Sequence, residues 1–137
     1  MRSSKPILLV EDDQVDAMTV KRALKEINVT NRLDIVDDGE KALAFLENPE
    51  NENPGIILLD LNMPRMNGIE FLHIVKKDDM LQKIPVIVLT TSREDQDKVD
   101  SFKLGVAGYM VKPVDYLKFV EVVKTIDLYW TLSELPE

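Results

Sequence analysis

The stretch ILLVEDD, residues 7–13, places four apolar residues directly before three acids. An uninterrupted apolar run of this length predicts a strand buried on both faces, which is typical of a parallel sheet covered by helices. The pattern returns in IILLD, residues 56–60, and in VIVLT, residues 86–90, and each run again ends in a polar residue. These three segments therefore predict the centre of a parallel sheet.

Helical and weaker strand patterns alternate with these runs. Between residues 13 and 28, Ala17, Val20 and Leu24 recur at helical spacing, and Asn28 is the expected end of that helix. RLDIVD, residues 32–37, alternates as a half-buried strand does, with Leu33 and Ile35 on one side. We further expect helices over 39–47, 69–77, 94–105 and 115–132, a short strand from 108 and a loop at 48–55. Strand and helix alternate five times, which predicts one α/β domain: a five-stranded parallel sheet with helices on both faces.

The length, net charge and cysteine content of the chain restrict the functions that it can have. The chain has 137 residues, a net charge of −8 and no cysteine. An acidic domain of this size repels phosphate backbones, so no direct binding to nucleic acid is expected. The lack of cysteine excludes disulfides and thiolate metal sites. No apolar run suits a signal peptide or a membrane span, so a cytoplasmic protein without membrane attachment is expected.

Chemically active residues follow the predicted strands. Because a parallel α/β sheet binds ligands beyond the carboxyl ends of its strands, these side chains are expected to share one pocket; they are Glu11, Asp12, Asp60, Thr90 and Lys112. Clustered carboxylates repel one another, and Mg²⁺ is the cation that best relieves this repulsion while leaving positions for phosphate oxygens. A carboxylate beside a metal, a lysine and a hydroxyl predicts phosphoryl transfer to an aspartate, with Asp60 as nucleophile and Asp12 as the better metal ligand. Asp13 is expected to cap a helix or to lie on the surface.

Four motifs, LLVEDD, ILLDLNMPRMNG, VIVLTTS and GYMVKP, together resemble the receiver domain of two-component response regulators over residues 5 to about 127. The resemblance implies the strand order 2-1-3-4-5 of the flavodoxin-like receiver fold. It also implies that Asp60 becomes a 4-aspartylphosphate, that Mg²⁺ is bound by Glu11, Asp12, Asp60 and the backbone carbonyl of Asn62, and that Lys112 assists. Thr90 and Tyr109 match the switch positions. The implied partner is a sensor histidine kinase, and the domain is no enzyme beyond promoting its own phosphorylation and dephosphorylation.

The last segment, TIDLYWTLSELPE, resembles the C-terminus of the small receivers that partner bacterial phytochromes, which are typically homodimers through the last strand and helix. We expect the domain to span residues 5–130, with a tail at 131–137. The last helix is apolar on more than one face, so its end either binds a second copy or folds back over its own domain.

Two other functions remain open from the sequence. The domain could be a phosphorelay intermediate or phosphate sink without a conformational output. A magnesium-dependent phosphohydrolase is disfavoured, because those enzymes usually carry a second aspartate at the position of Asn62. His73, the single histidine, lies on a helical pattern away from the strand ends and is expected at the surface or partly packed.

Overall fold

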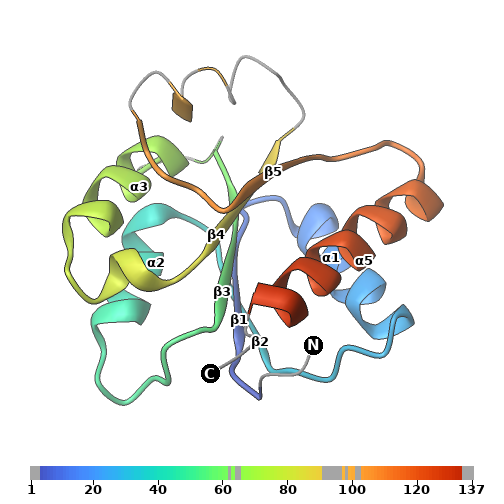
Figure 1. The fold of residues 1–137 in the computed structure, drawn as a ribbon, viewed down its shortest axis with the longest axis horizontal. Coiled ribbons are helices and arrows are strands. Elements are labelled where there is room, and N and C mark those ends of the chain that lie inside the picture. Colours follow the sequence, from blue (N-terminus) through green and yellow to red (C-terminus); the bar gives the residue numbers. More distant parts are fainter. Residues whose placement is uncertain are drawn as a thin grey trace.

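The computed structural model describes residues 4–61, 63, 66–90, 97, 99–100 and 103–133, and its centre is a parallel sheet (Figure 1). The strands are β1 (Ile7–Val10), β2 (Leu33–Val36), β3 (Ile56–Asp60), β4 (Val86–Thr90) and β5 (Gly108–Val111). They lie in the order β2-β1-β3-β4-β5, and every neighbouring pair is parallel. The predicted fold class and strand order are confirmed.

Helices cover both faces of this sheet. They are α1 (Gln14–Glu26), α2 (Gly39–Glu47), α3 (Gly68–Lys77) and α5 (Tyr116–Ser133), with a short 3₁₀ helix, η1 (Leu81–Lys83). In Figure 1, α1 and α5 lie on one face, and α2 and α3 lie on the other. The helix predicted over 94–105 falls largely outside the described residues. Within the described part of the chain, no helix combines the length and apolar character needed to cross a membrane.

The apolar strands supply two cores. Successive residues of a strand point to opposite faces, so Ile7 and Leu9 pack with α1 and α5, whereas Leu8 and Val10 pack with α2 and α3. All four side chains are completely buried. β1 is therefore fixed on both faces and along both edges, and the acids that follow it are held in place by the sheet.

Both predicted ends of α1 are confirmed. Asp13 caps the helix, because its Oδ1 accepts a hydrogen bond from the Asp16 backbone N–H at 3.0 Å. Asn28, just beyond the helix, has φ 63°, the left-handed conformation that asparagine tolerates better than most residues. The acid at position 13 is thus explained by local backbone chemistry.

Some apolar side chains are less buried than their patterns indicate. Ile35 remains 41% exposed, because β2 lies at the edge of the described sheet, beside β1. Val15 and Met18, which flank the apolar stripe of α1, are 74% and 58% exposed. Ala17, Val20 and Leu24 are buried, so only the narrow stripe itself faces the core.

The end of α5 returns to its own domain. Trp130 is 1% exposed and packs against Gly55, where an added Cβ would lie 2.3 Å from the indole Cζ2. Val111, Leu128 and Tyr129 stay substantially exposed. One face of the helix is therefore covered intramolecularly, while apolar residues nearby remain available to a partner.

Candidate functional site

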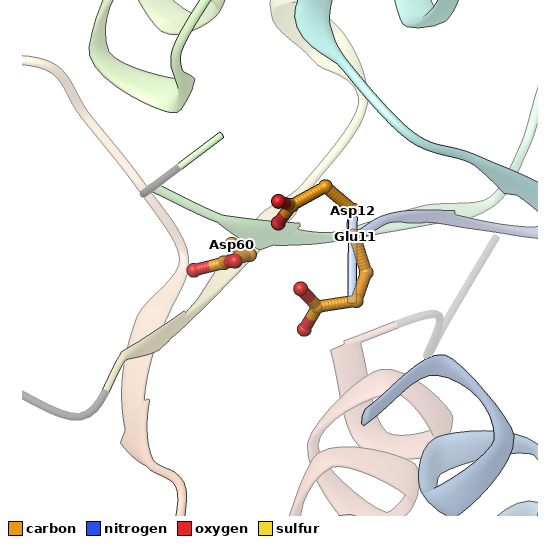
Figure 2. A group of neighbouring side chains, drawn as sticks. All are labelled: Glu11, Asp12 and Asp60. Carbon is orange, nitrogen blue, oxygen red and sulfur yellow. The ribbon is translucent and has the colours of Figure 1, made fainter. Parts of the chain in front are cut away.

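Three carboxylates meet where β1 and β3 end. Glu11 and Asp12 directly follow β1, and Asp60 is the last residue of β3, its neighbour in the sheet. Ligand oxygens of the three side chains lie within 4.8 Å of one another. Figure 2 shows the carboxylates turned toward a common space. We call these residues the acidic cluster; the sequence predicted all three members.

The acidic cluster is electrostatically strained when fully ionised. Glu11 is 2% exposed and Asp60 is 9% exposed, whereas Asp12 is exposed to solvent. Two ionised carboxylates about 4.8 Å apart repel by about 3–4 kcal/mol at an effective dielectric constant near 20. Burial raises the pKa of Glu11 to about 7, and the hydrogen bond with Asp60 and the charge of Asp60 act in the same direction. Near neutral pH the cluster therefore retains a proton on Glu11 for part of the time.

Among the residues that the structure describes, Lys112 brings a positive charge to the site. It follows β5, and its side chain is 12% exposed. The Nζ group donates to Glu11 Oε1 and, at 3.3 Å, to Asp16 Oδ2. Burial, the largest single influence, lowers the pKa of Lys112, but the hydrogen bond to Glu11 and the charges of Asp60, Glu11 and Asp16 together raise it above its ordinary value. The ammonium form is thereby maintained.

A glycine keeps the backbone close to Asp60. Gly68, the first residue of α3, donates its N–H to the Leu61 carbonyl at 3.0 Å. A Cβ at this position would lie 2.6 Å from Leu61 Cα and 2.8 Å from the Asp60 carbonyl oxygen. Any larger residue would thus push the start of α3 away from the end of β3. Asn67 and Glu70 form a reciprocal capping box that fixes this start.

The other predicted site residues are described only in part. Asn62 lies outside the described residues. Thr90 ends β4 and pairs with Val111 of β5, but its side chain is not described. Tyr109, on β5, is half-buried, and its hydroxyl donates to Asp100 Oδ1 at 2.7 Å. Burial, the hydrogen bond with Asp100 and the charge of Asp100 raise the pKa of Tyr109.

Sequence reasoning missed two residues of the site. Gly68 could have been found from the pattern NGIE, residues 67–70, which carries the capping-box signature at a helix start. Asp16 had no comparable signal, because its partner Lys112 lies 96 positions along the chain. His73 is partly buried on α3 and belongs to no group of metal-ligating side chains among the described residues.

The chemistry of the acidic cluster fits a hard divalent cation. Its donors are carboxylate oxygens from Glu11, Asp12 and Asp60, without nitrogen or sulfur ligands. Oxygen-only sites of this kind suit Mg²⁺ or Mn²⁺. The residues present therefore match the predicted metal in type and in placement.

Comparison with known proteins agrees with this geometry. Residues 7–124 match the family model described as the response regulator receiver domain. The response regulator Rcp1 of Synechocystis sp. is 40% identical over 130 residues, which cover 92% of this chain and 88% of Rcp1.

Solved structures give the same result. The phosphorylated cyanobacterial phytochrome response regulator RcpA superimposes with a TM-score of 0.87 at 35% identity, covering 98% of this chain and all of RcpA. The Mn²⁺-bound form of Rcp1 has a TM-score of 0.81 at 38% identity, covering 92% of this chain and 94% of the other. The metal in that structure is of the class that the acidic cluster fits.

Proposed function

Because this chain belongs to the response regulator receiver family, we propose that it accepts a phosphoryl group on Asp60 from a sensor histidine kinase. The observation that carries the proposal is the arrangement of the acidic cluster. Asp60 stands at the end of a central strand, with carboxylate oxygens of Glu11 and Asp12 within 4.8 Å. Lys112 contributes a positive charge at the same edge of the sheet.

The reaction is a displacement at phosphorus. A carboxylate oxygen of Asp60 forms the new O–P bond, and the P–N bond of the donor phosphohistidine breaks, leaving the electron pair on the imidazole. Lys112 offers its ammonium to an oxygen of the transferring group. Glu11, Asp12, Asp60 and the carbonyl of Asn62 would hold Mg²⁺, which would supply further neutralisation of the phosphoryl charge. The side chains of this chain provide the nucleophile and the lysine charge.

We further propose that phosphorylation changes the surface near β5. The Thr90 hydroxyl is attracted to the new phosphoryl oxygens, and Tyr109 then turns toward the space that Thr90 leaves. This movement requires Tyr109 to release Asp100, to which it now donates. The hydrogen bond therefore stabilises the unphosphorylated arrangement.

The kinase is proposed to be of the phytochrome type. RcpA, which this chain matches over nearly its whole length, is a cyanobacterial phytochrome response regulator. The net charge of −8 disfavours nucleic acid as the direct target, so a protein partner in the cytoplasm is the expected recipient of the signal.

Phosphorylation with a small donor tests the assignment. Incubation with acetyl phosphate and Mg²⁺ should add one phosphoryl group, measured by intact mass, and Asp60→Asn should abolish the gain. Asp38→Asn is the matched control, because Asp38 is also buried but caps α2 outside the acidic cluster. Labelling that persists in Asp60→Asn would contradict the assignment of Asp60.

We also propose that two copies associate through β5 and α5. Val111, Leu128 and Tyr129 are exposed apolar side chains on these elements. Light scattering should show a mass that rises with concentration, and Leu128→Glu should weaken the association. Met80→Glu, which alters an exposed residue just beyond α3, should leave it unchanged. A monomer at every concentration would exclude this dimer.

A further inference from the structure

Asp16 contacts the lysine of the site without belonging to the acidic cluster. Its Oδ2 lies 3.3 Å from Lys112 Nζ, and its side chain is 47% exposed. Asp16 occupies the first turn of α1, where Asp13 holds its backbone N–H at 3.0 Å. The capped start of α1 thus places the carboxylate of Asp16 beside Lys112, which directly follows β5.

The ammonium of Lys112 contacts two carboxylates, those of Glu11 and Asp16. Of these two, Glu11 belongs to the acidic cluster and Asp16 does not. Glu11 accepts from Lys112 and also belongs to the acidic cluster, whose carboxylate oxygens could hold a cation. A cation bound there competes with Lys112 for the charge of Glu11. Asp16 is outside the group that could bind the cation, so its contact with Lys112 is free of this competition.

We infer that Asp16 is a positioning residue, which keeps the Lys112 ammonium beside Asp60 when a divalent cation occupies the acidic cluster. An ammonium has three N–H donors. With Asp16 and Glu11 accepting two of them, the third remains for an oxygen of the transferring group. The catalytic part of this inference rests on the proposed function; the anchoring of Lys112 does not.

A hollow beside Lys112 gives its side chain room to move. A hollow of about 250 Å³ opens between α1 and the start of α5, and both Asp16 and Lys112 line it, with Pro113 and Val114. Val114 lines the hollow and is fully exposed, so its side chain does not close this space. A lysine has a flexible four-carbon stem, and restricting it requires a fixed partner. Without Asp16, the ammonium would have room to turn into this hollow.

The mobility of Lys112 tests the anchor independently of phosphorylation. ¹³C relaxation of the Lys112 Cε group, measured with Mg²⁺ present, should show a lower order parameter in Asp16→Ala than in the unsubstituted protein. Asp13→Asn is the matched control: it removes one charge from the same helix start and keeps a capping side chain, whereas the ion pairs of Lys112 are with Glu11 and Asp16. Equal order parameters in the two variants would overturn the inference.

The rate of phosphorylation tests the consequence. With acetyl phosphate and saturating Mg²⁺, Asp16→Ala should be labelled about two- to fivefold more slowly than Asp13→Asn, the effect expected of a half-exposed ion pair. In a Lys112→Ala background, Asp16→Ala should have no further effect, because its action runs through the lysine. Equal slowing in both backgrounds would overturn the positioning role. If the unsubstituted protein is not labelled at all, the proposed function and the catalytic part of the inference both fail, while the relaxation measurement still decides the anchoring.

Discussion

Replacing Asp60 by asparagine should stabilise the metal-free protein. Asp60 and Glu11 are both buried, with oxygens within 4.8 Å of each other, and ionising both costs about 3–4 kcal/mol at an effective dielectric constant near 20. Lys112 offsets part of this cost, and the exposed Asp12 adds little because water screens it. We therefore expect Asp60→Asn to raise the free energy of unfolding by about 1–2 kcal/mol above about pH 8, where Glu11 is ionised.

The stabilisation that Asp60→Asn gives should disappear at acidic pH. The pKa of Glu11 is raised from 4.5 to about 7 in the folded protein. Between these values the folded state holds a proton that the unfolded chain releases, so the contribution of Glu11 to stability falls as pH rises through this window. Near pH 5, Glu11 is protonated and shares its proton with Asp60, so Asp60→Asn then replaces a charged acceptor by a neutral amide oxygen and weakens a favourable hydrogen bond. The stabilisation should thus shrink to about zero or reverse sign near pH 5.

Urea unfolding without metal, at about pH 8 and at about pH 5, measures the stabilisation by Asp60→Asn and its loss in acid. For a chain of this size, the gain at high pH corresponds to a rise in Tm of about 3–8 °C. Mg²⁺ should stabilise the unsubstituted protein by about 1.4 kcal/mol at ten times its dissociation constant, and Asp60→Asn by much less. Asp38→Asn, outside the acidic cluster, should show neither the gain nor its pH dependence. A variant at position 60 that is destabilised at high pH would refute the electrostatic reasoning.

Three further predictions follow from single contacts. Mg²⁺ affinity, measured by calorimetry, should fall as pH drops below about 7, because the metal must displace the proton of Glu11, and binding should release protons to the buffer; affinity independent of pH would contradict this. Gly55→Ala should destabilise the protein by about 1–3 kcal/mol in urea, because the new Cβ meets Trp130 at 2.3 Å, whereas Gly105→Ala, with open space around it, should be nearly neutral. Asp13→Ala should cost about 0.5–2 kcal/mol through loss of the α1 cap and Asp13→Asn much less; similar costs for both would exclude capping as the role of Asp13.

The central strands were predictable because burial on both faces leaves a strong pattern. β1, β3 and β4 are apolar at nearly every position and lie in the middle of the sheet. The burial of β2 was harder to predict, because an edge strand needs less apolar surface than a central strand. Ile35 fits the alternating pattern and is nevertheless 41% exposed. The sequence pattern indicates which residues are apolar enough to be buried. Which of these residues are buried in the folded protein depends on how the helices pack against the sheet.

Site residues were predictable where the strands themselves place them. Glu11, Asp12 and Asp60 each sit at a strand end, and parallel strands bring their carboxyl ends to one edge. The contact between Asp16 and Lys112 depends instead on how α1 packs beside the segment that follows β5. No local pattern records this relation, so only the structure could reveal it.

Among the described residues and their expected ligands, a proton, the ammonium of Lys112 and a divalent cation can each neutralise part of the charge of the acidic cluster. In the metal-free protein, a proton on Glu11 and the ammonium of Lys112 share the neutralisation. A divalent cation held by the acidic cluster would displace the proton, since both need the oxygens of Glu11. Asp16 lies outside the acidic cluster and still contacts Lys112, so the lysine can keep its place during this exchange. In the proposed phosphoryl transfer we therefore expect metal binding to come first, because the incoming group would add negative charge that Lys112 alone would not balance while Glu11, Asp12 and Asp60 are all ionised.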